Sequence, residues 1–234
     1  MIDLHNHTIF SDGSCHPQKI IETAENIGLN FIAITDHYTT SWKASIINHL
    51  TKKTIPEYLN TIRKIREKSQ VGVLIGVEID TESNLQSLID IPLDKFELIL
   101  FEYVKSLNTL KTFYNFIKKT LDTKKVNEYP IIALAHPNIH LSLNKNILEE
   151  EFIPYIVKNE IYFELNTRYS EYYIGYEPII KKLIDNGVKF TIGSDSHSIS
   201  RIGESRLAFS FLSKLNGIKN LINNEKLSKY ILKI

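Results

Sequence analysis

Cysteine is almost absent from this sequence, and the single one is Cys15. One cysteine excludes an internal disulfide and any zinc site built from cysteine pairs. Metal ligands, if there are any, must therefore be histidine, aspartate or glutamate. The sequence also offers Cys15 no evident base partner, which argues against a cysteine nucleophile.

Long apolar runs and an excess of one charge are missing as well. No apolar run approaches the length of about 18 residues that suggests a membrane span, and the N-terminus lacks the basic and apolar regions of a signal peptide. We therefore expect a cytoplasmic protein with no membrane partner.

Basic and acidic side chains number 28 and 27 and are spread along the chain, so no basic stripe could neutralise a nucleic-acid backbone. A small phosphorylated substrate is favoured, and a nucleotide or short oligonucleotide is the remaining nucleic-acid alternative. The oligomeric state stays open.

What the sequence does contain is a regular alternation of short apolar runs and helical periods. Seven apolar runs indicate buried strands: Ile2–Leu4, Phe31–Ile34, Val71–Val77, Phe96–Phe101, Ile131–Ala135, Ile161–Phe163 and Lys189–Ile192. Apolar residues three and four apart predict helices over residues 17–27, 56–67, 110–121, 148–158 (interrupted by Pro154), 178–185 and 204–234.

This alternation predicts a parallel α/β sheet, either closed as a barrel or open and doubly wound. Each apolar run leads into His, Asp or Glu. In a barrel all strand carboxyl ends open onto one face, so these side chains would share a pocket, whereas an open sheet would spread them along an edge. No Gly-x-Gly-x-x-Gly turn favours the open alternative. We therefore expect one barrel domain over residues 1–234, with a helical C-terminal tail from about residue 204.

The candidate site residues lie at these predicted strand ends. They are His5, His7, Asp12, His37, Glu78, Glu102, His136, Glu164, Asp195 and His197. A lone His-x-His pair is a weak signal, although on a strand both imidazoles leave the same face. Its recurrence with acids at other strand ends makes a metal site the better interpretation. His16, His49 and His140 fall in loop or helix sequence and are assigned no role.

Imidazole and carboxylate donors without thiolate suit zinc, manganese or iron. The donors exceed the about four protein ligands of one ion, so two or three divalent ions are expected. Such ions can lower the pKa of bound water to about 7 and stabilise the attacking and leaving oxygens together. Hydrolysis of a phosphate ester through a metal-bound hydroxide is the reaction that this chemistry favours.

Six motifs, in order, carry a family resemblance: His5-Asn-His7, Ser11-Asp12-Gly13, Thr35-Asp36-His37, Gly76-Val-Glu78, Ala135-His136-Pro137 and Gly193-Ser-Asp195-Ser-His197. Together they resemble the polymerase and histidinol phosphatase (PHP) phosphoesterases over about residues 1–203. The resemblance implies a distorted seven-stranded (β/α)7 barrel, similar to a TIM barrel, with a two- or three-metal centre. It also implies the ligands: His5, His7, Glu78 and Asp195 for a first ion, Glu78 and His136 for a second, and Asp12, His37 and His197 for a third.

One segment departs from the family pattern. After the fourth strand the family has Gly-Ser-x-His, whose histidine binds the second ion, whereas residues 101–104 here are Phe-Glu-Tyr-Val. Glu102 is the candidate substitute from a shifted position. Without it, the second ion is weakly held, or the centre has two ions and an altered metal preference. Whether the substrate is histidinol phosphate therefore stays open.

Five polar residues near the strand ends each have two interpretations. Asp36 either orients the neighbouring histidine or faces solvent. Glu164 and Asn166 either reach the pocket, as ligand or substrate contacts, or form structural hydrogen bonds. Arg168 and Arg201 either grip phosphate or are solvated loop cations.

Two aromatic residues, Tyr38 and Trp42, either line the entrance or pack onto the barrel rim.

We therefore expect a metal-dependent phosphoesterase that hydrolyses a small phosphomonoester. A group among Asp12, His37 and His197, or water bound to it, would protonate the leaving alkoxide, and Arg168 or Arg201 would add positive charge. The alternatives are a metal-dependent nuclease or nucleotide phosphatase, a cyclic-amide hydrolase, and a non-catalytic barrel with a degenerate site that binds metal or phosphate.

Overall fold

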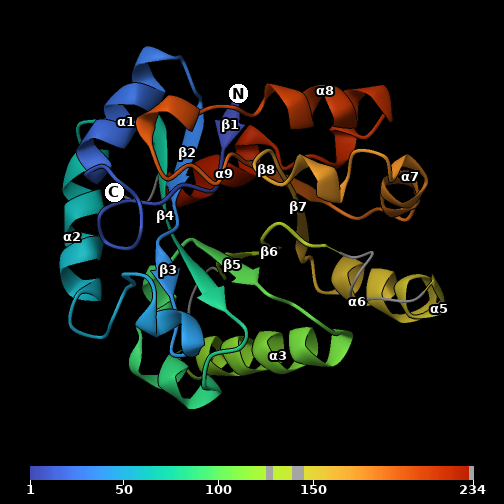
Figure 1. The fold of residues 1–234 in the computed structure, drawn as a ribbon, viewed down its shortest axis with the longest axis horizontal. Coiled ribbons are helices and arrows are strands. Elements are labelled where there is room, and N and C mark those ends of the chain that lie inside the picture. Colours follow the sequence, from blue (N-terminus) through green and yellow to red (C-terminus); the bar gives the residue numbers. More distant parts are fainter. Residues whose placement is uncertain (125–128, 139–144, 232–234) are drawn as a thin grey trace.

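A computed structural model describes residues 1–124, 129–138 and 145–231 of the chain (Figure 1). Its strands are β1 (Ile2–Asp3), β2 (Phe31–Ile34), β3 (His37–Tyr38), β4 (Gly72–Asp80), β5 (Leu98–Glu102), β6 (Ile131–Leu134), β7 (Tyr162–Asn166) and β8 (Phe190–Gly193). They pair in parallel in the order β1-β2-β4-β5-β6-β7-β8. β2 pairs with the first part of β4 and β3 with its last part, so these two form one interrupted strand.

The two edges of this sheet meet. The Leu4 amide donates to the carbonyl of Ile192 at 2.9 Å, and the His7 amide donates to the carbonyl of Ser196 at 2.8 Å. The first and last strands are thus joined, and the sheet is nearly closed. This confirms the predicted barrel of seven parallel strands.

Helices cover the outside of the barrel (Figure 1). They are α1 (Pro17–Asn26), α2 (Ile55–Arg66), α3 (Leu107–Thr123), α5 (Lys145–Ile147), α6 (Ile153–Lys158), α7 (Glu177–Asp185), α8 (Arg206–Lys214) and α9 (Asn224–Ile231). The apolar period that predicted α3 is buried against the sheet through Leu110, Phe113, Ile117 and Leu121. Burial of one apolar face, rather than helix propensity alone, holds such helices in place.

Two stretches expected as continuous helices are divided. Pro154 lies in the first turn of α6, where its missing amide costs nothing, and a π-helical turn over Leu148–Phe152 precedes that helix. In the tail, α8 ends because Asn216 adopts a left-handed backbone with φ 58°, and a 3-10 turn separates α8 from α9.

The tail packs at the amino ends of the strands. The Ile222 amide donates to the carbonyl of Phe190, the first residue of β8, at 2.9 Å, and α9 packs on β4 near Gly72. The carboxyl ends of the strands are thus left to the loops that carry the candidate site. Within the described ranges, no helix is long and apolar enough to cross a bilayer.

Candidate metal centre

The candidate residues converge at the carboxyl ends of the strands. They come from around the barrel: His5, His7 and Asp12 after β1, His37 in β3, Glu78 in β4, Glu102 at the end of β5, His136 after β6, Glu164 in β7, and Asp195 and His197 after β8. A cavity of about 310 Å³ lies here, lined by Asp12, His37, Lys43, Glu102, Tyr103, His136, Arg168, Tyr169, Tyr172, Asp195 and His197. Only a closed sheet brings strand ends so far apart in sequence to one place.

Two imidazoles face each other at the centre of the cluster. His5 Nε2 lies 3.0 Å from His7 Nε2, and Asp195 Oδ1 lies 3.1 Å from the latter nitrogen. Glu78 Oε2 is 3.3 Å from His5 Nε2 and 3.5 Å from His7 Nε2. When both nitrogens are unprotonated, His5, His7 and Asp195 offer three donor atoms close enough together to share a divalent cation.

Glu78 gives a further test of whether these residues fit an ion. Its Oε2 atom is buried without a hydrogen bond in the described part of the chain, although His37 Nδ1 lies 2.8 Å away. Its other oxygen, Oε1, lies 3.1 Å from His136 Nε2. A buried polar atom without a partner costs about 1–3 kcal/mol, more when it is charged. A bound cation would satisfy this oxygen, so the donor set fits a metal centre.

Asp12 joins two histidines on the more open side of the cluster. Its Oδ1 atom lies 3.2 Å from His197 Nε2 and 3.7 Å from His37 Nε2, and its side chain is 25% exposed. Burial raises the pKa of the Asp12 carboxyl, but the contacts with His197 and His37 outweigh it and hold that pKa below its usual range. This trio, with His7, is a second group of atoms close enough to share an ion.

Charge decides which imidazoles are neutral before an ion binds. Burial lowers the pKa of His5, but the charges of Glu164 and Glu78 outweigh it and raise that pKa well above its usual value. Burial likewise opposes the charged form of His37, whose pKa Glu78 nevertheless raises to about 10. Burial and the nearby His37 lower the pKa of His7 to about 3. An ion that takes His5 or His37 as ligand must therefore displace a proton.

Glu164 contacts His5 and His136 from outside the cluster of facing imidazoles. Its Oε1 atom lies 2.9 Å from His5 Nδ1, the nitrogen that points away from the cluster. Its Oε2 atom accepts from the His136 backbone amide at 2.7 Å and from Asn166 Nδ2 at 3.0 Å. These contacts favour the structural interpretation of Glu164 and Asn166 over direct ligation. A carboxylate on the outer nitrogen of a ligating histidine fixes its tautomer and its ring orientation.

Replacing Glu164 by glutamine is expected to weaken metal affinity by about 10–100-fold, because His5 loses the charged acceptor that orients it. Calorimetric titration of metal-stripped protein with Zn²⁺ or Mn²⁺ measures this. Glu171→Gln, at an exposed position in the turn after β7, is the matched control and should bind like the wild type. Equal affinities in both variants would contradict the orienting role.

Asp36 is buried and does not face solvent. It accepts hydrogen bonds from the Thr8 amide at 2.8 Å, from the Thr8 hydroxyl at 2.7 Å and from the Ser11 hydroxyl at 2.5 Å. Ser11 Oγ in turn lies 3.4 Å from His7 Nδ1. Asp36 therefore holds the loop that carries His7, rather than orienting the adjacent His37 as one interpretation of the sequence had it.

Asp3 is a supporting residue that the sequence interpretation did not single out. It is fully buried and accepts from the Ser194 amide at 2.8 Å, the Ser194 hydroxyl at 2.7 Å and the Gly203 amide at 2.8 Å. These bonds tie β1 to the end of β8, where Asp195 follows. The signal available in the sequence was an acid within a run, Ile2–Leu4, that otherwise reads as a buried strand.

The two candidate arginines differ. Arg168 lines the cavity, and its Nη1 atom lies 2.6 Å from His197 Nδ1 and 3.3 Å from the carbonyl oxygen of Asp195. Arg201 is not among the lining residues, and its Nε donates to Glu204 at 2.9 Å on the surface. For Arg201 these observations favour the solvated loop cation over a phosphate contact.

Tyr38 and Trp42 do not line the cavity either. Tyr38 is buried, and its hydroxyl donates to the carbonyl of Ser87 at 3.0 Å, as packing on the rim requires. Trp42 is 57% exposed and donates through Nε1 to Glu82 at 2.7 Å. Cys15 is half-buried outside the cavity.

Three histidines were assigned no role. His16 caps α1 by accepting from the Gln18 amide at 3.2 Å. His49 lies outside the cavity, with its Nδ1 atom 3.2 Å from the carbonyl oxygen of Ile47. His140 lies outside the described residues.

The backbone turns sharply where strands deliver site residues. Tyr103 follows β5 with φ 57°, and His136 and Asp195 lie two residues after β6 and β8 with φ 32° and 51°. Few residues other than glycine adopt this region, and it costs about 1–3 kcal/mol unless the surroundings hold it. The turns direct the side chains of His136 and Asp195 into the barrel mouth.

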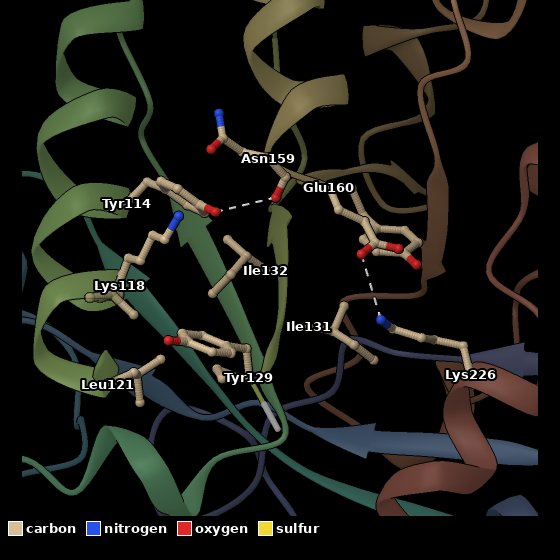
Figure 2. A pocket seen from close by; sticks show the side chains of 12 residues that line it. Tyr114, Lys118, Leu121, Tyr129, Ile131, Ile132, Asn159, Glu160 and Lys226 are labelled. Atoms are coloured by element: carbon tan, nitrogen blue, oxygen red, sulfur yellow. Dashed lines mark hydrogen bonds and ion pairs between the residues drawn. The ribbon is translucent and has the colours of Figure 1, made fainter. Parts of the chain in front are cut away.

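A second cavity, of about 340 Å³, lies at the amino ends of β6 and β7, away from the metal cluster (Figure 2). Tyr114 and Tyr129 line one part of it, and Glu160 faces Lys226 on the other at 3.7 Å. No histidine is among its lining residues in the described part of the chain. This cavity therefore offers no comparable metal site.

Comparison with known proteins agrees with this geometry. The model of the PHP domain matches residues 3–224. PolX of Bacillus subtilis, a DNA polymerase/3'-5' exonuclease, is 26% identical over 96% of this chain, which spans 39% of the length of PolX. A probable histidinol-phosphatase of Thermotoga maritima is 25% identical, with 87% of each chain covered. The fold matches histidinol phosphate phosphatase of Lactococcus lactis, crystallised with zinc, L-histidinol and phosphate, at TM-score 0.63 and 19% identity, over 92% of this chain and 93% of that one.

Because the family model covers nearly the whole barrel, the chain belongs to the PHP family and is a metal-dependent phosphoesterase. The resemblance inferred from six motifs is thus confirmed.

Proposed function

We propose that this chain hydrolyses a small phosphomonoester in the cavity at the carboxyl ends of its strands. One observation supports this above all: the facing Nε2 atoms of His5 and His7, 3.0 Å apart, lie 3.3 and 3.5 Å from the buried Glu78 Oε2. Imidazole and carboxylate donors so close together suit divalent cations such as zinc, manganese or iron. The cavity, of about 310 Å³, is at the small end of the usual range for ligand pockets.

The proposed ligands form three sets. They are His5, His7, Glu78 and Asp195 for one ion, Glu78 and His136 for a second, and Asp12, His37 and His197 for a third. Zinc, manganese or iron suits these donors. When bound, such ions make hydroxide available near neutral pH and neutralise the phosphoryl oxygens. Glu164 is left out because its oxygens already contact His5 Nδ1 and the His136 amide.

The chain itself offers groups for positioning and proton transfer. Arg168 presents a guanidinium in the cavity, where it can donate to a phosphoryl oxygen. We assign protonation of the leaving alkoxide to the Asp12, His37 and His197 trio or to water that it holds. Asp12 by itself is the weakest donor of the trio, because the pKa of its carboxyl is held below its usual range and the group is an anion with no proton to give.

Exonucleolytic cleavage is the second candidate, because PolX, named as a 3'-5' exonuclease, matches 96% of this chain. Phosphomonoester and phosphodiester hydrolysis need the same metal chemistry and differ in what must fit beside the phosphate. The balanced net charge of +1 offers little attraction for a long nucleic acid, so a nucleotide end is the form of this alternative to test.

A substrate panel with metal-stripped protein tests both. We expect no turnover without metal, and metal-dependent release of phosphate from p-nitrophenyl phosphate and from small phosphomonoesters, L-histidinol phosphate among them. A single-stranded oligonucleotide and bis-p-nitrophenyl phosphate are the diester arm. Preferential cleavage of the diesters would favour the exonuclease. Absence of turnover on every ester with Zn²⁺, Mn²⁺ or Fe²⁺ bound would refute the phosphoesterase assignment for this chain.

A further inference from the structure

Lys43 was not a candidate in the sequence, yet its side chain reaches the metal cavity. Its Nζ atom lies 2.8 and 2.7 Å from the two carboxylate oxygens of Glu102 and 3.3 Å from both ring nitrogens of His37. The lysine side chain is 11% exposed and that of Glu102 is 2% exposed. This is a buried ion pair inside the cluster, and surface screening does not weaken it.

The Lys43 ammonium lies at a position where a metal ion could otherwise bind. Atoms of His37, Glu78 and Glu102 lie close enough together to share a cation. Glu102 is also the candidate substitute, two residues before Val104, for the histidine that the family has after this strand. Both of its oxygens are already engaged by one ammonium, which leaves no uncompensated charge for a divalent ion. Without Glu102, an ion at this corner would have only His37 and Glu78 as protein ligands instead of the usual three or four.

The turn that carries Lys43 is anchored to the barrel. Ser41 caps it by accepting from the Lys43 amide at 3.2 Å and donates to Asp80 at the end of β4. The aromatic ring of Tyr103 lies on the other side, with its centroid 5.3 Å from the ammonium, within the range of a cation–π contact. The lysine is therefore positioned by β4 and by the residue after β5, and not by its flexible stem alone.

We propose that the Lys43 ammonium is a resident cation of this centre and takes the place of one divalent ion at the corner formed by His37, Glu78 and Glu102. The inference rests on the proposed function, because it presumes that ions fill the remaining positions. The centre then binds one ion fewer than its donors could hold. The departure at residues 101–104 brings an acid, Glu102, in place of the family's histidine. The Lys43 ammonium neutralises this acid and takes the place of a metal ion.

Counting ions tests this without reference to activity. Metal-stripped protein is reloaded with Mn²⁺ or Zn²⁺, freed of excess ion and measured by elemental analysis. Lys43→Met keeps the length of the side chain and removes its charge, so it should bind about one more ion per chain, because Glu102 becomes a free ligand. Lys43→Arg keeps the cation and should match the wild type. Lys105→Met, which removes an exposed lysine paired with Glu82, is the matched control.

Glu102→Gln provides the reverse test. If the ammonium occupies this corner, Glu102→Gln should bind as many ions as the wild type. The double variant Lys43→Met/Glu102→Gln should lose the extra ion that Lys43→Met alone binds. An unchanged ion count in folded Lys43→Met, or the loss of an ion in Glu102→Gln, would overturn the proposal. If Lys43→Met does not fold, the ion count of Glu102→Gln tests the proposal in its place. A wild type that binds no ion would instead refute the proposed function, and this proposal with it.

Discussion

Replacing Asp195 by asparagine is expected to lower kcat/KM for p-nitrophenyl phosphate by at least about 10³-fold and to reduce the metal content of the protein. Asp195 Oδ1 lies 3.1 Å from His7 Nε2 at the centre of the cluster. Burial raises the pKa of this carboxyl, but the charge of His5 outweighs it and holds the pKa below its usual range, so the group is an anion. Asparagine keeps its shape and removes that charge.

Asparagine is the better test than alanine because Asp195 has a left-handed backbone, with φ 51°, which asparagine tolerates more readily. We therefore expect the circular dichroism spectrum to be unchanged, so that lost activity reports on the site. Asp185→Asn, an exposed position on α7, is the control and should retain full activity. Wild-type activity in Asp195→Asn would remove this residue from the proposed ligands.

Replacing Gly193 by alanine is expected to destabilise the fold by about 1–3 kcal/mol and to weaken metal affinity as well. A Cβ atom at Gly193 would lie 2.2 Å from Glu164 Oε1 and 2.4 Å from the Cβ atom of His5. The Glu164 side chain can shift only by leaving His5 Nδ1, which it contacts at 2.9 Å. The His5 Cβ atom is tied to the backbone of the loop and cannot move alone.

Gly72→Ala separates the two effects, because Gly72 lies at the amino end of β4. Its added Cβ atom would meet side-chain atoms of Phe31 at 2.4 Å and of Ile231 at 2.5 Å, far from the ligands. Thermal unfolding should show a loss of stability in both variants, whereas calorimetric metal titration should show weakened binding only in Gly193→Ala. Unchanged affinity in Gly193→Ala would mean that Glu164 and His5 need not be held as closely as proposed.

Much of the architecture follows from local pattern. The apolar runs Phe31–Ile34 and Ile131–Ala135 became strands β2 and β6 of the barrel, because short runs without a polar residue are typical of strands in a sheet buried on both faces. Element ends were less well predicted. Glu78 and Glu164 lie inside their strands rather than after them, since hydrogen bonding to neighbouring strands, which no local pattern contains, decides where a strand stops.

By itself, the sequence determined the alternation of strand and helix, the donor types and their position at strand ends, and with these a metal-dependent phosphoesterase barrel. Only the tertiary structure decided that Arg168 faces the cavity while Arg201 pairs with Glu204, and that the ammonium of Lys43 meets Glu102. The reason is physical. Strand and helix periods are properties of neighbours along the chain, whereas the direction of a loop side chain depends on packing against segments remote in sequence.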